Sequence, residues 1–121
     1  MEEQLNQLAN TINPLTLLVG VIFVIAAVVV YIFPPKKINN FYGYRTASSM
    51  KSQEAWDFSQ RYSAVFMFWI GLVLLGSSLI NLLLPMSQNA DVILGSVLIV
   101  VGCVFLIWST EKNIKKKFPN P

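Results

Sequence analysis

The side chains that could carry out specific chemistry are concentrated in one stretch, residues 39–56, which reads NNFYGYRTASSMKSQEAW. It is the only dense mixture of aromatic, amide, hydroxyl and charged groups in an otherwise apolar chain. The guanidinium of Arg45 could bond to helix carbonyls or hold an anionic group. Gly43 fits a tight turn that lets Tyr42 and Tyr44 point to different surfaces. We therefore expect recognition to occur in this stretch.

Hydrolytic and metal chemistry is disfavoured by the residue types that are missing. The chain has no histidine and a single cysteine, Cys103, so neither a Ser-His-Asp nor a Cys-His arrangement can form. The carboxylates are dispersed without metal-ligand spacing, and there is no Gly-rich phosphate loop. An enzyme acting on lipid head groups would have to use Glu54, Asp57 and Arg45. The two carboxylates, beside Lys51 and Arg61, more simply form a solvated ionic face. We expect no catalytic residues, no metal and no cofactor.

The rest of the chain indicates a membrane protein, because 55% of the residues are hydrophobic and only 12% are charged. Three apolar runs are long enough to cross a hydrocarbon core of about 30 Å at about 1.5 Å per residue. They cover about residues 15–33, 63–84 and 91–109. Pro34 and Pro85 stop the first two. We predict an all-α integral membrane protein with three transmembrane helices, in which residues 1–121 form a single domain.

The cationic side chains predict the orientation, since Lys and Arg beside membrane spans are retained on the cytoplasmic side. All of them lie either between the first and second spans or after the third. They are Lys36, Lys37, Arg45, Lys51, Arg61, Lys112, Lys115, Lys116 and Lys117. We therefore expect the N-terminus outside, the C-terminus inside and a cytoplasmic loop at residues 34–62. Glu2 and Glu3 precede the first span without any cation, which disfavours a cleavable signal peptide.

The net charge of +3 does not require a nucleic-acid partner. We interpret the basic residues 112–117 as an anchor to anionic lipid head groups, in preference to a docking site. Small residues recur one heptad apart in each span and predict close helix packing, within the chain or in a homo-oligomer. The pairs are Gly20 with Ala27, Gly71 with Ser78, and Gly95 with Gly102.

Within the loop, a turn through residues 42–44 should precede a short interfacial helix that begins near Ser52. Ser52 is a suitable N-cap, and the carboxylates that follow it are favoured by the helix dipole. Helical spacing places one set of residues on a common face of this helix. The set is Trp56, Ser59, Gln60 and Ser63. The aromatic residues also have a simpler explanation, because Tyr and Trp concentrate at membrane interfaces in general.

The block Asn39-x-x-Tyr42-Gly43-Tyr44-Arg45-Thr46, followed by Ser49-Met50-Lys51-Ser52 and Glu54-x-Trp56, resembles the signature of the SdpI family of bacterial membrane proteins. In that family the block lies in a cytoplasmic loop between the first and second helices of a three-helix unit. The resemblance covers about residues 15–109. It gives a candidate motif for ligand or partner binding, or for ordering the loop: Asn39, Tyr42, Gly43, Tyr44, Arg45, Thr46, Ser49, Lys51 and Trp56. We expect Trp56 to dock the loop helix to the bundle, and Tyr44 and Arg45 to make contacts or order the loop.

The resemblance also implies a function in immunity. The founding members protect a cell from a secreted membrane-active peptide toxin and signal by sequestering a transcriptional repressor at the membrane. We therefore expect a multi-pass protein of the bacterial cell membrane that gives immunity or resistance to such a toxin, with signalling through the loop. The expected partners are the lipid bilayer, a peptide toxin, a cytoplasmic regulatory protein and a second copy of the chain. The alternative is a small oligomeric transporter or channel for an anionic or amphipathic molecule, with Arg45 at its cytoplasmic mouth.

Overall fold

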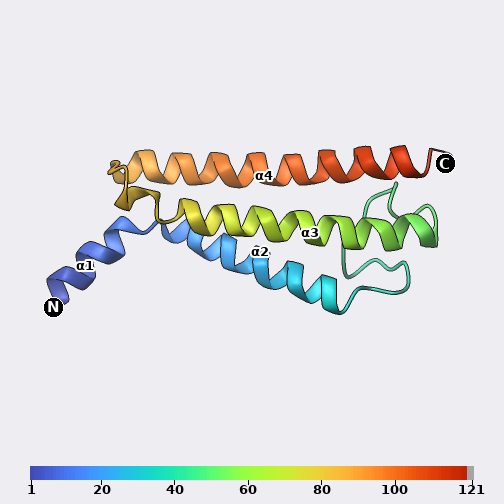
Figure 1. Ribbon diagram of the computed structural model, residues 1–121, viewed down its shortest axis with the longest axis horizontal. Helices are drawn as coiled ribbons and strands as arrows, with labels where there is room; N and C mark the ends of the chain where they lie inside the picture. The colour runs from blue at the N-terminus through green and yellow to red at the C-terminus, as the bar shows by residue number, and fades with distance from the viewer. Residues whose placement is uncertain (120–121) are drawn as a thin grey trace.

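The computed structural model describes residues 1–119, apart from the side chains of residues 8–11, and all its regular elements over that range are helices (Figure 1). The elements are α1 (Glu2–Thr11), α2 (Pro14–Ile32), α3 (Gln53–Ser77), a 3-10 helix η1 (Ile80–Leu82) and α4 (Gln88–Lys117). Three helical segments are long and apolar enough to cross a membrane: α2, α3 together with η1, and α4. The all-helical class and the three membrane helices predicted from the sequence are thus confirmed.

Polar side chains fix where the long helices begin. Asn13 caps α2, since its side-chain oxygen accepts hydrogen bonds from the backbone N–H groups of Leu15 and Thr16. The expected cap at Ser52 is present and bonds to the N–H of Ala55. Ser87 caps α4 in the same way. Each cap satisfies a backbone donor that the first turn of a helix leaves without an intrahelical partner.

The separate interfacial helix expected after Ser52 is instead the first part of α3, which runs unbroken from Gln53 to Ser77. The non-helical part of the loop between the first two membrane helices is therefore residues 33–52; the predicted loop of residues 34–62 also included the helix that begins near Ser52. The hydroxyls of Ser59 and Ser63 donate back to backbone carbonyls of α3, so these polar side chains are satisfied within the unbroken helix. The helix α1, in turn, has no counterpart in the sequence-based expectations.

Glycines let the membrane helices approach closely, with α3 lying between α2 and α4 (Figure 1). A Cβ atom on Gly20 would lie 3.1 Å from the carbonyl oxygen of Gly71, and a Cβ on Gly71 would lie 3.1 Å from that of Gly20. Gly95 similarly faces Asn13, the N-cap of α2, and Thr16 within α2. Gly102 faces Ile70 of α3. The small-residue seams therefore serve packing within this chain.

The two ends of the bundle are closed differently. At the α1 end, the Asn13 side chain donates to the carbonyl of Asp91 at 2.9 Å, and the Asn13 N–H donates to the carbonyl of Ser78 at 2.9 Å. At the other end lie the loop 33–52, the start of α3 and the last turns of α4 (Figure 1). The fold thus brings the loop motif to the end where α4 finishes.

Candidate functional site

The loop of residues 33–52, called the motif loop below, begins with a turn built by Asn39. The Oδ1 atom of Asn39 accepts hydrogen bonds from the N–H groups of Phe41 at 2.9 Å and Tyr42 at 2.8 Å. Its Nδ2 atom donates to the carbonyl of Lys37 at 2.8 Å. A short amide side chain that bonds to backbone groups on both sides folds the chain back on itself.

Tyr42 caps the C-terminus of α2. Its hydroxyl donates to the carbonyl of Phe33 at 2.7 Å and lies 3.5 Å from that of Val29. The last carbonyls of a helix have no partners within the helix, and a side-chain donor can satisfy them. Tyr42 therefore ties the motif loop to the first membrane helix.

Gly43 adopts a conformation that other residues rarely take, with φ at 100°. A Cβ atom at this position would collide with Oε1 of Gln60 and would lie 2.7 Å from Cγ of Pro35. Both the backbone angle and the available space therefore require glycine here. The expected turn through Tyr42, Gly43 and Tyr44 has this physical basis.

Gln60 of α3 holds the backbone of Tyr44 at two points. Its Oε1 atom accepts from the Tyr44 N–H at 2.6 Å, and its Nε2 atom donates to the Tyr44 carbonyl at 2.7 Å. The Gln60 side chain is 1% exposed, so these bonds are shielded from solvent. Sequence reasoning placed Gln60 on the face of Trp56 but did not include it in the site; its position one turn after Trp56 was the only signal.

Trp56 is completely buried, and its indole Nε1 donates to the carbonyl of Pro35 at 2.7 Å. The whole face predicted to contain Trp56 is buried in the structure, including Ser59, Gln60 and Ser63. This face of α3 therefore binds the motif loop at two points, through Pro35 before the loop's turn and through Tyr44 at the end of it.

Thr46 and Ser49 close a second turn by bonding to each other. The Ser49 Oγ atom accepts from the Thr46 N–H at 2.8 Å, and the Thr46 Oγ1 atom accepts from the Ser49 N–H at 3.2 Å. The Ser49 hydroxyl also lies within hydrogen-bond distance of the carbonyls of Tyr44 and Thr46. Ser49 is fully buried, so this turn forms part of the interior of the site.

Glu111 of α4 is the partner that sequence reasoning missed. One of its carboxylate oxygens accepts from the Tyr44 hydroxyl at 2.8 Å and from the Thr46 hydroxyl at 2.6 Å. Burial, together with the hydrogen bond to Glu111 and the negative charge of that carboxylate, raises the pKa of Tyr44 above its usual value. The only signal in the sequence was that Glu111 is the single carboxylate after the third span.

The remaining motif residues, Arg45 and Lys51, are exposed. The described residues provide no hydrogen-bond partner for the Arg45 side chain, so it does not clamp the helix carbonyls. Phe41 lies on the same loop and is 91% exposed. The structure thus divides the motif into residues that bond or pack inward and a basic pair that faces outward. The inward set is Asn39, Tyr42, Gly43, Tyr44, Thr46, Ser49 and Trp56.

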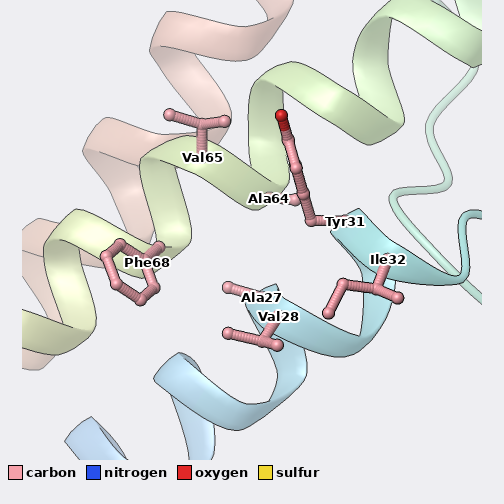
Figure 2. Close-up of a pocket in the computed structure, with 7 residues that line it drawn as sticks. All are labelled: Ala27, Val28, Tyr31, Ile32, Ala64, Val65 and Phe68. Carbon is pink, nitrogen blue, oxygen red and sulfur yellow. The ribbon is translucent and has the colours of Figure 1, made fainter.

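A groove of about 1040 Å³ opens beside the motif loop, between the end of α2, the start of α3 and the end of α4. A second cavity of about 420 Å³ lies between α2 and α3 (Figure 2). The part of the chain that the structure describes contains no group of three or more Cys, Asp or Glu side chains that could hold a metal ion.

Three long apolar helices, with a hydrogen-bonded loop fixed to one end, define a multi-pass α-helical membrane protein. Residues 36–110 match the SdpI/YfhL protein family, and the chain belongs to this family. Over 96 residues it is 40% identical to the uncharacterized protein YfhL of Bacillus subtilis (strain 168), an alignment that covers 79% of this chain and 82% of that protein. No solved structure matches the chain.

Proposed function

We propose that this protein protects the membrane that contains it against a membrane-active peptide toxin, and that the outward face of the motif loop is required for this protection. The observation that carries the proposal is the exposed guanidinium of Arg45, placed between two residues that are both bonded to Glu111. Tyr44 and Thr46 fix the backbone on either side of Arg45. A preorganised loop with free donors loses less entropy when it binds a partner.

The orientation is part of the same proposal. The motif loop, the start of α3 and the last turns of α4 lie at one end of the bundle and contain all nine cationic residues. Because Lys and Arg beside membrane spans are retained inside, this end would face the cytoplasm of a bacterial cell. Arg45, Lys51 and Phe41 would then be accessible to a cytoplasmic regulatory protein, which makes signalling through the loop part of the proposal.

The test is survival of bacteria exposed to membrane-active peptides secreted by related strains, with and without this chain. Arg45→Ala and Arg45→Lys should be compared with Lys37→Ala, which removes one exposed cation of the same loop outside the motif. All proteins should be expressed to matched levels in the membrane. We expect the wild type and Lys37→Ala to protect, Arg45→Ala to lose most of the protection, and Arg45→Lys to retain part of it, since an ammonium keeps the charge but loses the planar fork.

Two results would count against the proposal in different ways. Wild-type protein that reaches the membrane at normal levels and protects against none of the peptides would contradict the immunity function. Full protection by Arg45→Ala would be compatible with the immunity function but would show that Arg45, on the outward face of the loop, is not required for it. Flux of an anionic solute through vesicles that contain the unprotective wild type would instead favour a transporter.

A further inference from the structure

The cavity between α2 and α3 is almost entirely apolar and has a volume of about 420 Å³. Its walls come from facing sides of the two helices, with Ala27, Val28 and Ile32 on α2 and Ala64 and Phe68 on α3 (Figure 2). Ala27 and Ala64 are both buried, and their short side chains leave the hollow between the helices. The volume falls in the range of roughly 300–1,000 Å³ that is usual for small-ligand sites.

This apolar cavity borders the larger groove beside the motif loop. Tyr31 and Val65 line both, so the two hollows adjoin at these side chains. Arg61, Val65 and Phe68 follow each other at helical spacings of four and three residues, which places them on one face of α3. At about 1.5 Å per residue, this face leads over roughly 10 Å from a charged end to an apolar end.

The larger groove contains cationic groups from three separate segments. They are Lys36 of the motif loop, Arg61 of α3 and Lys117 at the end of α4. The Nζ atom of Lys117 lies over the ring of Phe58, 4.6 Å from the ring centroid. Two carboxylates, those of Glu54 and Asp57, also line the groove, so the three cations outnumber them. The carboxylate of Asp57 already accepts a hydrogen bond from Gln53 at 2.9 Å.

We propose that the adjoining cavity and groove together form a binding site for one anionic phospholipid of the bilayer. An acyl chain would occupy the apolar cavity between Ala27 and Ala64, and the phosphate would lie among Lys36, Arg61 and Lys117. The charge complementarity distinguishes this site from ordinary lipid contact, because each nearby Lys or Arg attracts an anionic head group by about 1 kcal/mol. The proposal does not depend on the immunity function, since it concerns a different surface from Arg45.

The test uses the full chain, purified and reconstituted in vesicles of equal parts phosphatidylglycerol and phosphatidylcholine, followed by extraction in detergent. Native mass spectrometry then counts the lipids that remain bound. We expect one phosphatidylglycerol to be retained in preference to phosphatidylcholine. Arg61→Gln should lower this preference about fivefold, the equivalent of one lost charge interaction, whereas Lys116→Gln, which removes an exposed cation outside the groove, should leave it unchanged.

A second pair of variants tests the apolar part. Val28 and Val21 are both on α2 and both 39% exposed, but only Val28 lines the cavity. Val28→Phe should abolish retention of the lipid, and Val21→Phe should not. Equal retention of the two lipids by the wild type, or identical behaviour within both pairs of variants, would overturn the proposal. If the wild type shows no lipid preference while Val28→Phe prevents binding of a membrane-active peptide added to the vesicles, the groove is a peptide site.

Discussion

The hydroxyl of Tyr44 donates a hydrogen bond of 2.8 Å to the carboxylate of Glu111, although the two residues are 67 positions apart. Thr46 donates to the same oxygen at 2.6 Å. One carboxylate of α4 thus holds the centre of the motif loop, while Tyr42 joins the loop to α2 and Gln60 joins it to α3. The motif loop is therefore fixed to all three membrane helices by hydrogen bonds.

Replacement of Glu111 should loosen this attachment in a graded way. Glu111→Ala removes the acceptor of two hydroxyls, and we expect it to lower the free energy of unfolding by about 1–3 kcal/mol. Glu111→Gln should cost less, because an amide oxygen still accepts both bonds. Thermal unfolding in detergent micelles measures the effect, with Lys116→Ala as an exposed control on the same helix. Unchanged stability of Glu111→Ala would show that the contact contributes nothing.

Ionisation of Tyr44 should destabilise the protein at high pH. Burial and the neighbouring Glu111 raise the pKa of Tyr44 above the usual value of about 10, so the folded state keeps the phenolic proton longer than the unfolded state. The stabilisation is complete below pH 10 and is lost as the pH rises through the folded-state pKa. Absorbance titration of the wild type should show a tyrosine transition above the usual pH range, and this transition should be missing in Tyr44→Phe. A wild-type titration identical to that of Tyr44→Phe would contradict the prediction.

Two glycine substitutions should have opposite consequences. Gly43→Ala places a Cβ at a φ of 100° and against Gln60 and Pro35, so we expect little folded protein in the membrane. Gly76→Ala lies in α3, and its Cβ would meet nothing within 4 Å. Alanine is favoured over glycine in a helix by roughly 0.5–1 kcal/mol, so Gly76→Ala should be as stable as the wild type or slightly more so. Quantitative blotting of membrane fractions distinguishes the two; equal levels would refute the space argument at Gly43.

Gln60→Leu should be among the most destabilising changes at the loop end. It leaves the N–H of Tyr44 without its acceptor and removes one of the two donors to the Tyr44 carbonyl, which keeps the hydroxyl of Ser49. We therefore expect a loss of about 1–3 kcal/mol in the free energy of unfolding, the usual cost of one unsatisfied group. Gln88→Leu is the matched control, since Gln88 is exposed at the opposite end of the bundle. Similar stability of the two variants would mean that the Tyr44 backbone finds other partners.

The sequence by itself determined the three membrane helices, although not α1, and which residues share the inward face of α3. Apolar runs of membrane length require helices, because the backbone groups must bond internally in lipid. Ser52 was identifiable as a cap because capping depends on residues within one turn. Helical spacing alone placed Trp56, Ser59, Gln60 and Ser63 on one face, and the structure added that this face is buried. The motif residues were found through the resemblance to the family, and their positions in the loop follow from chain order.

Only the tertiary structure decided which of these motif residues bind inward and which remain exposed. The adjacent residues Tyr44 and Arg45 differ in environment, since Tyr44 is bonded inward and Arg45 is exposed. Nothing in their spacing indicates which of the two binds Glu111. That pairing depends on the depth at which α4 packs against α3 and on the close approach of Gly20 and Gly71, which positions α2. Local rules fix helices and caps because they act between near neighbours in the chain. The hydrogen bond between Tyr44 and Glu111 forms only because the packing of the three helices brings these two residues together.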